Sequence, residues 1–453
     1  MLFCSSVFFV FFIVFLLLWY ATPKKWHHWL IIIASLYFYG YWNWSYTLLP
    51  LGLTLGGFFS IKWIDNATGP QNKKFRLALC IAVMLIPLFI FKYLNFFLRR
   101  EIITVGLPLG ISYITFTLIA YLIDVAKKDY PAESHFSWLL AYVTYFPQLI
   151  AGPILRPREL LPQLKQNLQP TNLVRWQAVT IFTAGLVKKL IFADQIKPFV
   201  DSIYSVKGTP DALQSVIGFY LFPAQIYCDF SGYTDMAIGL ALFFGIQLPM
   251  NFNRPFLSCS TTEVWRRWQI TLSFWLRDYL YIPIVKKYNY KYIKPIAKFI
   301  TLTLCGLWHG ANWTYVVWGS FNGILLIVES LFKNTQWSRR LPKPIKILTT
   351  FHLFAFGVVF VRSRTIDQAW DILRSLFFWQ SFTLGDVSPY AYPLMLCSLT
   401  YFSHHWDCMD CLKEVVERSN RFLLTASLSV LWFLAVILNV LGGGSSKFIY
   451  FDF

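Results

Sequence analysis

The chain has 453 residues, of which 57% are hydrophobic, 19% are aromatic and only 14% are charged. About a quarter of the residues of a soluble protein are charged, so this composition excludes an ordinary soluble domain and indicates that lipid is the main solvent. A net charge of +18 would suggest nucleic acid binding in a soluble protein. Here the basic residues cluster in short connections, as is typical of membrane topology signals and anionic-lipid contacts, so we expect membrane lipid as a partner and no nucleic acid.

Uncharged apolar runs recur along the whole chain. They cover residues 1–23, 29–61, 102–123, 136–155, 212–228, 236–253, 299–328 and 422–446. A helix crosses a bilayer with about 20 mostly apolar residues, so these lengths predict roughly ten to thirteen membrane segments. Only helices and closed barrels satisfy their backbones in lipid, and these runs are too long for barrel strands. With no hydrophilic stretch long enough for a soluble domain, we expect one all-α membrane domain over residues 1–453.

The first run is followed directly by a basic connection. The run lacks the basic start and the small-residue cleavage site of a signal peptide. Lys24, Lys25, His27 and His28 follow it, and the positive-inside rule predicts that this connection is cytoplasmic and that the N-terminus faces outward. Two further basic connections, 286–298 and 333–346, suit topology and lipid contact. They also suit the guidance of a phosphate-bearing substrate from the cytoplasm.

Two regions break the apolar pattern. Proline and glycine punctuate residues 146–158, where freed backbone groups are tolerated only beside protein or water. Residues 251–287 mix aromatic and charged side chains. One face of an amphipathic helix is predicted there by residues at three- and four-residue steps, namely Trp265, Trp268, Leu272 and Trp275. Glu263 can pair with Arg266 and Arg267 on the other side. Together the two regions predict an internal, partly wet chamber.

His309 stands alone in the run 299–328. It is the only acid–base group between Lys298 and Glu329, and an ionisable residue at membrane depth is a functional-site hypothesis by default. A neutral imidazole can take the proton of a hydroxyl group that attacks an activated carbonyl. The alternative is a structural histidine bonded to a carbonyl group. Trp308 and Asn312 lie beside it as candidates for positioning a substrate.

Asp229 and Asp235 are two carboxylates between apolar runs, where each needs a partner. The candidate partners are Arg254, Arg266, Arg267 and Arg277. The pairs either hold helices around the chamber or orient the catalytic base, and the residues alone leave both readings open.

Other chemistries have weaker signals. Cys408 and Cys411 form a CxxC after His404 and His405, but no second ligand pair follows at zinc spacing, so we expect a polar loop and no metal. The chain has neither a G-x-S-x-G elbow nor a phosphate-binding G-x-x-x-x-G-K-[ST] loop. An acyl-enzyme triad and a nucleotide-hydrolysing motor are therefore not indicated, whereas direct acyl transfer from a thioester to a hydroxyl is compatible with a lone base.

At these residues the chain resembles the membrane-bound O-acyltransferase superfamily, and within it the bacterial branch that contains the alginate O-acetylation membrane protein. The matching motifs lie at residues 110–113, 121–125, 145–154, 225–237, 251–256, 265–268, 307–311 and 448–451. They follow one another over nearly the whole chain, and the block at 225–237 and the Leu-Trp-His-Gly-Ala at 307–311 are the most specific.

The resemblance implies a ring of tilted helices around a funnel that crosses the bacterial inner membrane. It places His309 at the family's catalytic position. It implies no tightly bound cofactor, a donor that is acetyl-CoA or an acyl-carrier thioester, and a periplasmic acetyltransferase or polysaccharide-secretion partner. Candidate substrate-positioning residues are Gln269, Asp229, Asp235, Arg266, Arg267, Trp308 and Asn312.

One departure from the branch concerns Gln269, which stands where a second histidine usually follows the Trp-Arg-Arg-Trp block. Glutamine forms hydrogen bonds but cannot carry a proton at neutral pH. The leading hypothesis is an O-acyltransferase, most simply an acetyltransferase, that modifies a cell-envelope or secreted polysaccharide. A catalytically weak scaffold for a periplasmic acetylation complex is the alternative that Gln269 favours. A transporter is a third alternative, although the chain lacks paired repeats.

Overall fold

The computed structural model describes residues 1–453 except 105, 167, 207, 209–210, 289, 333–334, 337–339, 378–383, 442–447 and 450–453. The regular secondary structure of this described part consists of helices and contains no strand, which confirms the predicted all-α class. Lys333 and Arg339 of the third basic connection, and positions 450–451 of the last motif, lie outside the described residues.

The chain forms two compact units. Unit 1 comprises Met1–Phe182 and Met236–Pro249, and unit 2 comprises Thr183–Asp235 and Met250–Phe453. The single domain expected from the sequence stays a prediction. Two of the three boundaries fall within helices, α9 (Asn172–Val187) and α11 (Ala212–Phe243), and the third, between Pro249 and Met250, follows α11.

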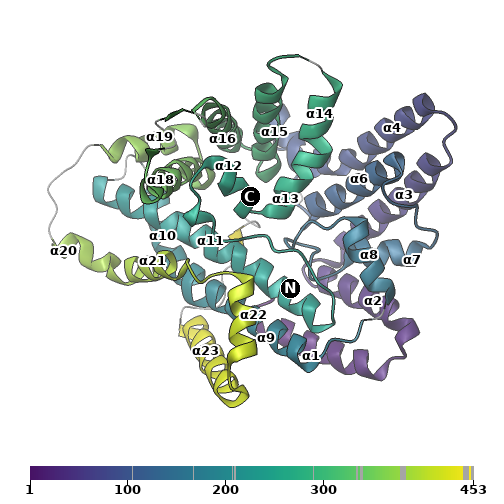
Figure 1. Cartoon of the computed structure of the whole chain (residues 1–453), viewed down its shortest axis with the longest axis horizontal. Coiled ribbons are helices and arrows are strands. Elements are labelled where there is room, and N and C mark those ends of the chain that lie inside the picture. The colour runs from purple at the N-terminus through teal and green to yellow at the C-terminus, as the bar shows by residue number, and fades with distance from the viewer. Residues whose placement is uncertain are drawn as a thin grey trace. The chain divides into compact units, whose positions relative to one another are not determined.

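Unit 1 is built from the N-terminal helices (Figure 1, purple to blue). They are α1 (Ser6–Ala21), α2 (His27–Gly40), α3 (Leu48–Asp65), α4 (Pro70–Leu88), α5 (Leu94–Leu98), α6 (Ile111–Lys127), α7 (Phe136–Thr144) and α8 (Pro157–Gln166), with short turns η1 (Lys24–Trp26), η2 (Trp44–Thr47) and η3 (Phe89–Tyr93) between them. The uncharged helix α1 buries Phe8 and Phe15 and leaves its other apolar residues largely exposed, as a helix that faces lipid does.

The proline- and glycine-rich region lies between α7 and α8, and side chains satisfy its backbone. The Phe146 N–H donates to Ser35 Oγ at 3.1 Å, and the Tyr142 hydroxyl donates to the Leu155 carbonyl at 2.8 Å. Gln148 Nε2 donates to the Tyr142 carbonyl at 2.6 Å. The sequence predicted that these freed backbone groups would lie beside protein or water, and buried hydrogen bonds within unit 1 show that their partners are protein groups.

Unit 2 carries the remaining helices. They are η4 (Lys188–Ala193), α10 (Asp194–Tyr204), η5 (Pro255–Leu257), α12 (Thr261–Arg267), α13 (Ile270–Leu276), η6 (Arg277–Tyr281), α14 (Ile282–Lys287), α15 (Ile293–His309), α16 (Trp313–Phe332), α18 (Lys343–Arg362), α19 (Ile366–Ser375), α20 (Leu384–Val387), η7 (Ser388–Tyr390), α21 (Ala391–Ser403), α22 (Met409–Arg418) and α23 (Arg421–Leu441).

The amphipathic helix predicted from Trp265, Trp268, Leu272 and Trp275 is broken. The α12 helix ends before Trp268, and Gln269 adopts the left-handed conformation with φ of 42°. The Asn253 N–H donates to the Arg267 carbonyl and the Ile270 N–H donates to the Asn251 carbonyl, both at 2.9 Å. These pairings with the preceding segment hold the break, so a three- and four-residue periodicity did not produce a continuous helix.

Five helical segments of the described part are long and apolar enough to cross a membrane. They are Trp44–Asp65, Pro70–Leu98, Trp313–Phe332, Lys343–Arg362 and Arg421–Leu441, with Ser6–Ala21 as a shorter apolar helix. This agrees with a multi-pass membrane protein. The expected ten to thirteen segments stay a prediction.

Candidate active site

Two closely packed helices position His309. Gly306 of α15 and Gly319 of α16 lie so close that a Cβ on Gly306 would be 3.0 Å from the Gly319 Cα and 2.2 Å from the Tyr315 carbonyl oxygen. Small residues allow such approach between membrane helices, and Figure 1 shows α15 and α16 side by side. His309 is the last residue of α15, and Gly310 continues in extended conformation. The histidine therefore lies at a helix end, within a rigid helical pair.

The His309 side chain is 6% exposed and lies among tryptophan rings. Its ring centroid is 4.8 Å from that of Trp308 and 5.1 Å from that of Trp318, both edge to face. The predicted neighbour Trp308 is thus in contact with the histidine, and Trp318, which the sequence did not single out, is a second contact.

A small cavity adjoins His309. It is lined by Ile226, Trp268, His309, Trp318, Phe354, Val358 and Val361, from four helices and the turn at Trp268. His309 is the one titratable side chain in this lining, and the others are apolar or aromatic. The cavity measures about 20 Å³, which is room for about one water molecule. The wet chamber expected from the sequence stays a prediction.

Gln269 follows Trp268, a cavity residue, directly in the chain. It is 1% exposed, and its side-chain Oε1 has no hydrogen-bond partner among the described residues. A buried amide oxygen without a partner costs free energy. The Gln269 side chain thus remains able to accept a hydrogen bond from a ligand or a water molecule.

Asp229 is held by a lysine and not by the arginines expected from the sequence. Its Oδ1 accepts from Lys189 Nζ at 2.6 Å, and its Oδ2 accepts from the Ile449 N–H at 2.7 Å. Lys189 also pairs with Asp194 at 2.8 Å. Asp229 lies one turn after the cavity residue Ile226 on α11, so this buried network fixes the helix that forms one wall of the cavity.

Asp235 has a parallel arrangement. Lys188 Nζ lies 2.8 Å from Asp235 Oδ2 and 2.5 Å from Asp407 Oδ1, and the Tyr227 hydroxyl donates to Asp407 Oδ2 at 2.5 Å. The expectation that arginines would pair with the two carboxylates is therefore wrong. The missed signal was the pair of adjacent charges, Lys188 and Lys189, in the otherwise uncharged stretch 176–193.

A second buried histidine, His404, adjoins this network. Its ring centroid is 4.7 Å from that of Tyr227, and its Nε2 accepts the Phe256 N–H at 3.1 Å. Burial lowers the pKa of His404 from its ordinary value of 6.5 to about 4, because the charged form loses its hydration. His404 is thus a neutral, structural acceptor.

The remaining predicted site residues have structural partners or face outward. Arg267 pairs with Glu263 at 2.7 Å, as predicted from their spacing, whereas the Arg266 side chain is exposed. Asn312 Oδ1 accepts the Thr314 N–H at the start of α16, and its Nδ2 donates to the Arg364 carbonyl, both at 3.1 Å. Asn312 therefore anchors the start of α16.

The cysteine motif forms a bond of its own. Cys408 and Cys411 are joined as a disulfide at the start of α22. Within the described residues, no group of three or more histidine, cysteine or carboxylate side chains is arranged to hold a metal ion.

Comparison with known proteins gives one family. The family model of the membrane-bound O-acyltransferases (MBOAT) matches residues 126–362, just over half of the chain. The probable alginate O-acetylase AlgI of Pseudomonas aeruginosa is 37% identical over 407 residues, which cover 86% of this chain and 77% of that protein.

Two further relatives have different named activities. The peptidoglycan O-acetyltransferase of Helicobacter pylori is 33% identical over 393 residues, which cover 78% of this chain and 73% of that protein. The teichoic acid D-alanyltransferase of Bacillus subtilis is 29% identical over 265 residues, which cover 55% of this chain and 67% of that protein. All three names describe the transfer of an acyl group to a cell-envelope or secreted polymer.

Proposed function

The chain belongs to the membrane-bound O-acyltransferase family, and from this membership we propose a reaction. The protein moves an acetyl group from a cytoplasmic thioester toward a hydroxyl of a cell-envelope or secreted polysaccharide. His309 is the general base. It is a multi-pass membrane O-acyltransferase. We assign it to the bacterial inner membrane, with a periplasmic acetyltransferase that completes delivery to the polymer.

The observation that carries the catalytic assignment is the setting of His309. It is the single titratable side chain in the lining of an otherwise apolar cavity, and α15 and α16 hold it between two tryptophan rings. A base confined in a water-poor site acts without competition from bulk solvent. The helical pair also fixes its position before a substrate arrives, which is what proton transfer in a transition state requires.

The proposed chemistry is one acyl transfer. His309 takes the proton of the hydroxyl that first receives the acetyl group, before the periplasmic partner completes delivery, as that oxygen attacks the thioester carbonyl. The carbon–oxygen bond forms and the carbon–sulfur bond breaks. The imidazolium then returns its proton to the departing thiolate, which leaves as a thiol. Gln269 is proposed to position one reactant through its amide, since it cannot exchange a proton at neutral pH.

The nature of the donor and acceptor is supported by the relatives and by charge. Two of the three relatives are named as O-acetylating proteins, and the three names give alginate, peptidoglycan and teichoic acid as the polymers acted on. The exposed Lys286 and Lys287 at the end of α14 suit the phosphates of either coenzyme A or a carrier-protein arm.

The test is acetyl transfer by purified protein in detergent with radiolabelled acetyl-CoA or an acetyl-carrier protein. The release of free thiol is followed with and without an acceptor glycan. We expect His309→Ala to lower the rate by about 10²–10⁴-fold, the usual contribution of a general base. His405→Gln is the matched control, because His405 is exposed and lies outside the cavity lining.

Two outcomes would reject parts of this proposal. A His309→Ala protein that folds and transfers acetyl within tenfold of wild type would exclude His309 as the base. No thiol release by the wild type with either donor, in a preparation that still binds its periplasmic partner, would favour the scaffold alternative.

A further inference from the structure

A second cavity lies in unit 1, beside the basic connection that follows α1. It measures about 190 Å³, roughly ten times the volume of the cavity at His309. Its lining consists of Trp19, Lys24, Lys25, His27, His28, Ile31, Trp138, Gln163, Leu164, Lys165, Leu168, Phe244 and Ile246. The lining thus combines cations and aromatic rings with an apolar floor, and it contains no carboxylate.

The cations give this cavity an excess positive charge. Lys24 and Lys25 are exposed at the rim and form the short turn η1. Lys165 pairs with Glu133 at 2.5 Å, so its charge is largely balanced. The excess of about two charges therefore comes from the adjacent lysines of η1, at the end of the apolar helix α1, which is where the level of lipid headgroups is expected.

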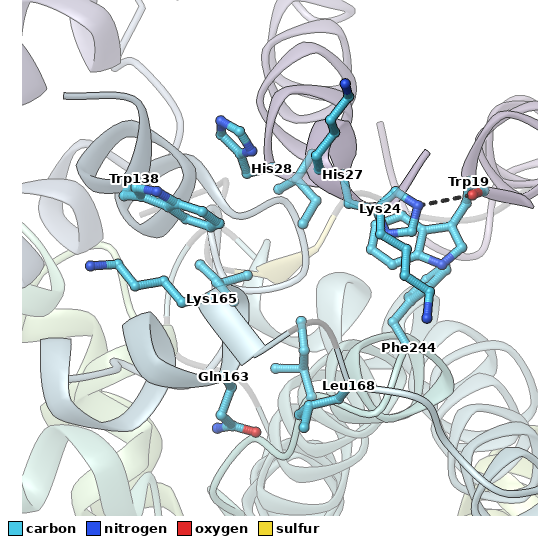
Figure 2. Close-up of a pocket in the computed structure, with 13 residues that line it drawn as sticks. Trp19, Lys24, His27, His28, Trp138, Gln163, Lys165, Leu168 and Phe244 are labelled. Atoms are coloured by element: carbon cyan, nitrogen blue, oxygen red, sulfur yellow. Dashed lines mark hydrogen bonds between the residues drawn. The ribbon is translucent and has the colours of Figure 1, made fainter. Parts of the chain in front are cut away.

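Two histidine–tryptophan stacks form the walls. The His27 and Trp19 ring centroids are 3.8 Å apart, and those of His28 and Trp138 are 4.4 Å apart, both stacked. Figure 2 shows Trp138 and Lys165 on one side of the space and Trp19 and Lys24 on the other. Aromatic rings at this level are typical of the boundary between the headgroup and acyl regions of a bilayer.

His27 lines the cavity, and only one of its two ring nitrogens forms hydrogen bonds with described residues. It is 8% exposed, and its Nε2 lies 3.1 Å from both the Trp19 and the Thr22 carbonyl oxygens, so Nε2 carries a proton and donates. Its Nδ1 is buried and has no hydrogen-bond partner among the described residues. A ligand hydroxyl, or a water molecule that a ligand holds, can satisfy this atom.

We propose that the unit 1 cavity binds the phosphodiester headgroup of an anionic phospholipid. Lys24 and Lys25 contact the phosphate. The apolar residues Leu168, Phe244 and Ile246 contact the first part of the acyl chains. A free phosphate compound such as coenzyme A shares the phosphate chemistry but would not contact the apolar residues of the cavity. These apolar residues therefore favour a lipid as the ligand. This site is independent of the proposed acetyl transfer.

The test is native mass spectrometry of the full-length protein released from detergent micelles that contain phosphatidylglycerol or phosphatidylcholine at equal concentration. We expect one phosphatidylglycerol molecule to be retained, and phosphatidylcholine to be retained much less. Each lysine near an anionic headgroup contributes about a fivefold gain in affinity. Lys24→Ala/Lys25→Ala should therefore weaken phosphatidylglycerol binding roughly thirtyfold.

The matched control is Lys73→Ala/Lys74→Ala, an adjacent lysine pair on α4 that is absent from the cavity lining. This variant loses the same formal charge and should retain phosphatidylglycerol as the wild type does. Equal loss in both double variants would show a general charge effect and overturn the site. Equal retention of both lipids would do the same. Binding of coenzyme A or inorganic phosphate in place of phosphatidylglycerol would overturn the assignment to a lipid.

Discussion

Removal of the Lys189 ammonium group is expected to be among the most destabilising single changes in unit 2. Lys189 Nζ lies 2.6 Å from Asp229 and 2.8 Å from Asp194, and all three side chains are less than a tenth exposed. Lys189→Met keeps most of the side-chain volume and removes the ammonium group that Asp229 and Asp194 share. Breaking a buried ion pair on one side costs about 3–5 kcal/mol, so we expect a loss of unfolding free energy in that range.

The second arm of this experiment removes one carboxylate as well. Asp229→Asn retains an oxygen that can accept the Ile449 N–H, which now donates at 2.7 Å. The double variant Lys189→Met/Asp229→Asn removes the charge of Asp229 together with that of its cation. It should therefore be less destabilised than the sum of the two single variants, with a coupling energy of about 1–3 kcal/mol.

The assay is equilibrium unfolding in mixed detergent micelles, with Lys197→Met as the control. Lys197 pairs with Asp201 at 3.1 Å within α10, where both side chains are partly exposed, and such a pair contributes about 1 kcal/mol or less. Two results would show that the buried network does not hold α11. One is a loss of unfolding free energy in Lys189→Met no larger than in Lys197→Met. The other is strict additivity of the losses caused by the changes at Lys189 and Asp229.

Three further predictions concern backbone and titration. In Gly306→Ala, the new Cβ would lie 2.2 Å from the Tyr315 carbonyl oxygen; we expect the α15–α16 pair to be forced apart at a cost of about 1–3 kcal/mol, with loss of acetyl transfer. In Gln269→Val, a β-branched residue must adopt φ of 42°, and we expect a loss of about 1–2 kcal/mol by thermal unfolding. Burial lowers the pKa of His404 from 6.5 to about 4. Between these pH values His404 is protonated in the unfolded chain but not in the folded chain. The free energy of unfolding should therefore fall as the pH drops from 6.5 to 4, by up to about 1.4 kcal/mol per pH unit.

Each has a matched control. Gly52→Ala adds a Cβ with no heavy atom within 4 Å in the interior of α3 and should lower neither stability nor activity. Gln269→Asn should fold normally, because asparagine tolerates the left-handed region and keeps the amide. His404→Gln should show a shallower loss of stability with acidification. A Gly306→Ala protein as active as Gly52→Ala, a Gln269→Val protein as stable as Gln269→Asn, or an unchanged pH slope in His404→Gln would contradict the corresponding geometry.

Much of the fold class follows from the sequence, because it depends on local composition. Long uncharged apolar runs can satisfy their backbone groups in lipid only as helices, and no long-range contact is needed to reach that conclusion. His309 stood out for the same reason, as a titratable residue in a run that has no other. The salt bridge from Glu263 to Arg267 was also predictable, since a spacing of four residues places them on one helix face.

The tertiary structure alone decided the partners of the buried charges. Asp229 bonds to Lys189, which is 40 residues away in the chain, and composition cannot rank that lysine against the arginines that lie nearer. The break at Gln269 was equally hidden, because it is held by backbone pairing with residues 251–253 and not by a proline or glycine. The two cavities arise only where separate helices fail to fill the space between them. Local composition thus set the helices and the isolated histidine, whereas contacts between distant segments decided how the charges pair and where a ligand can bind.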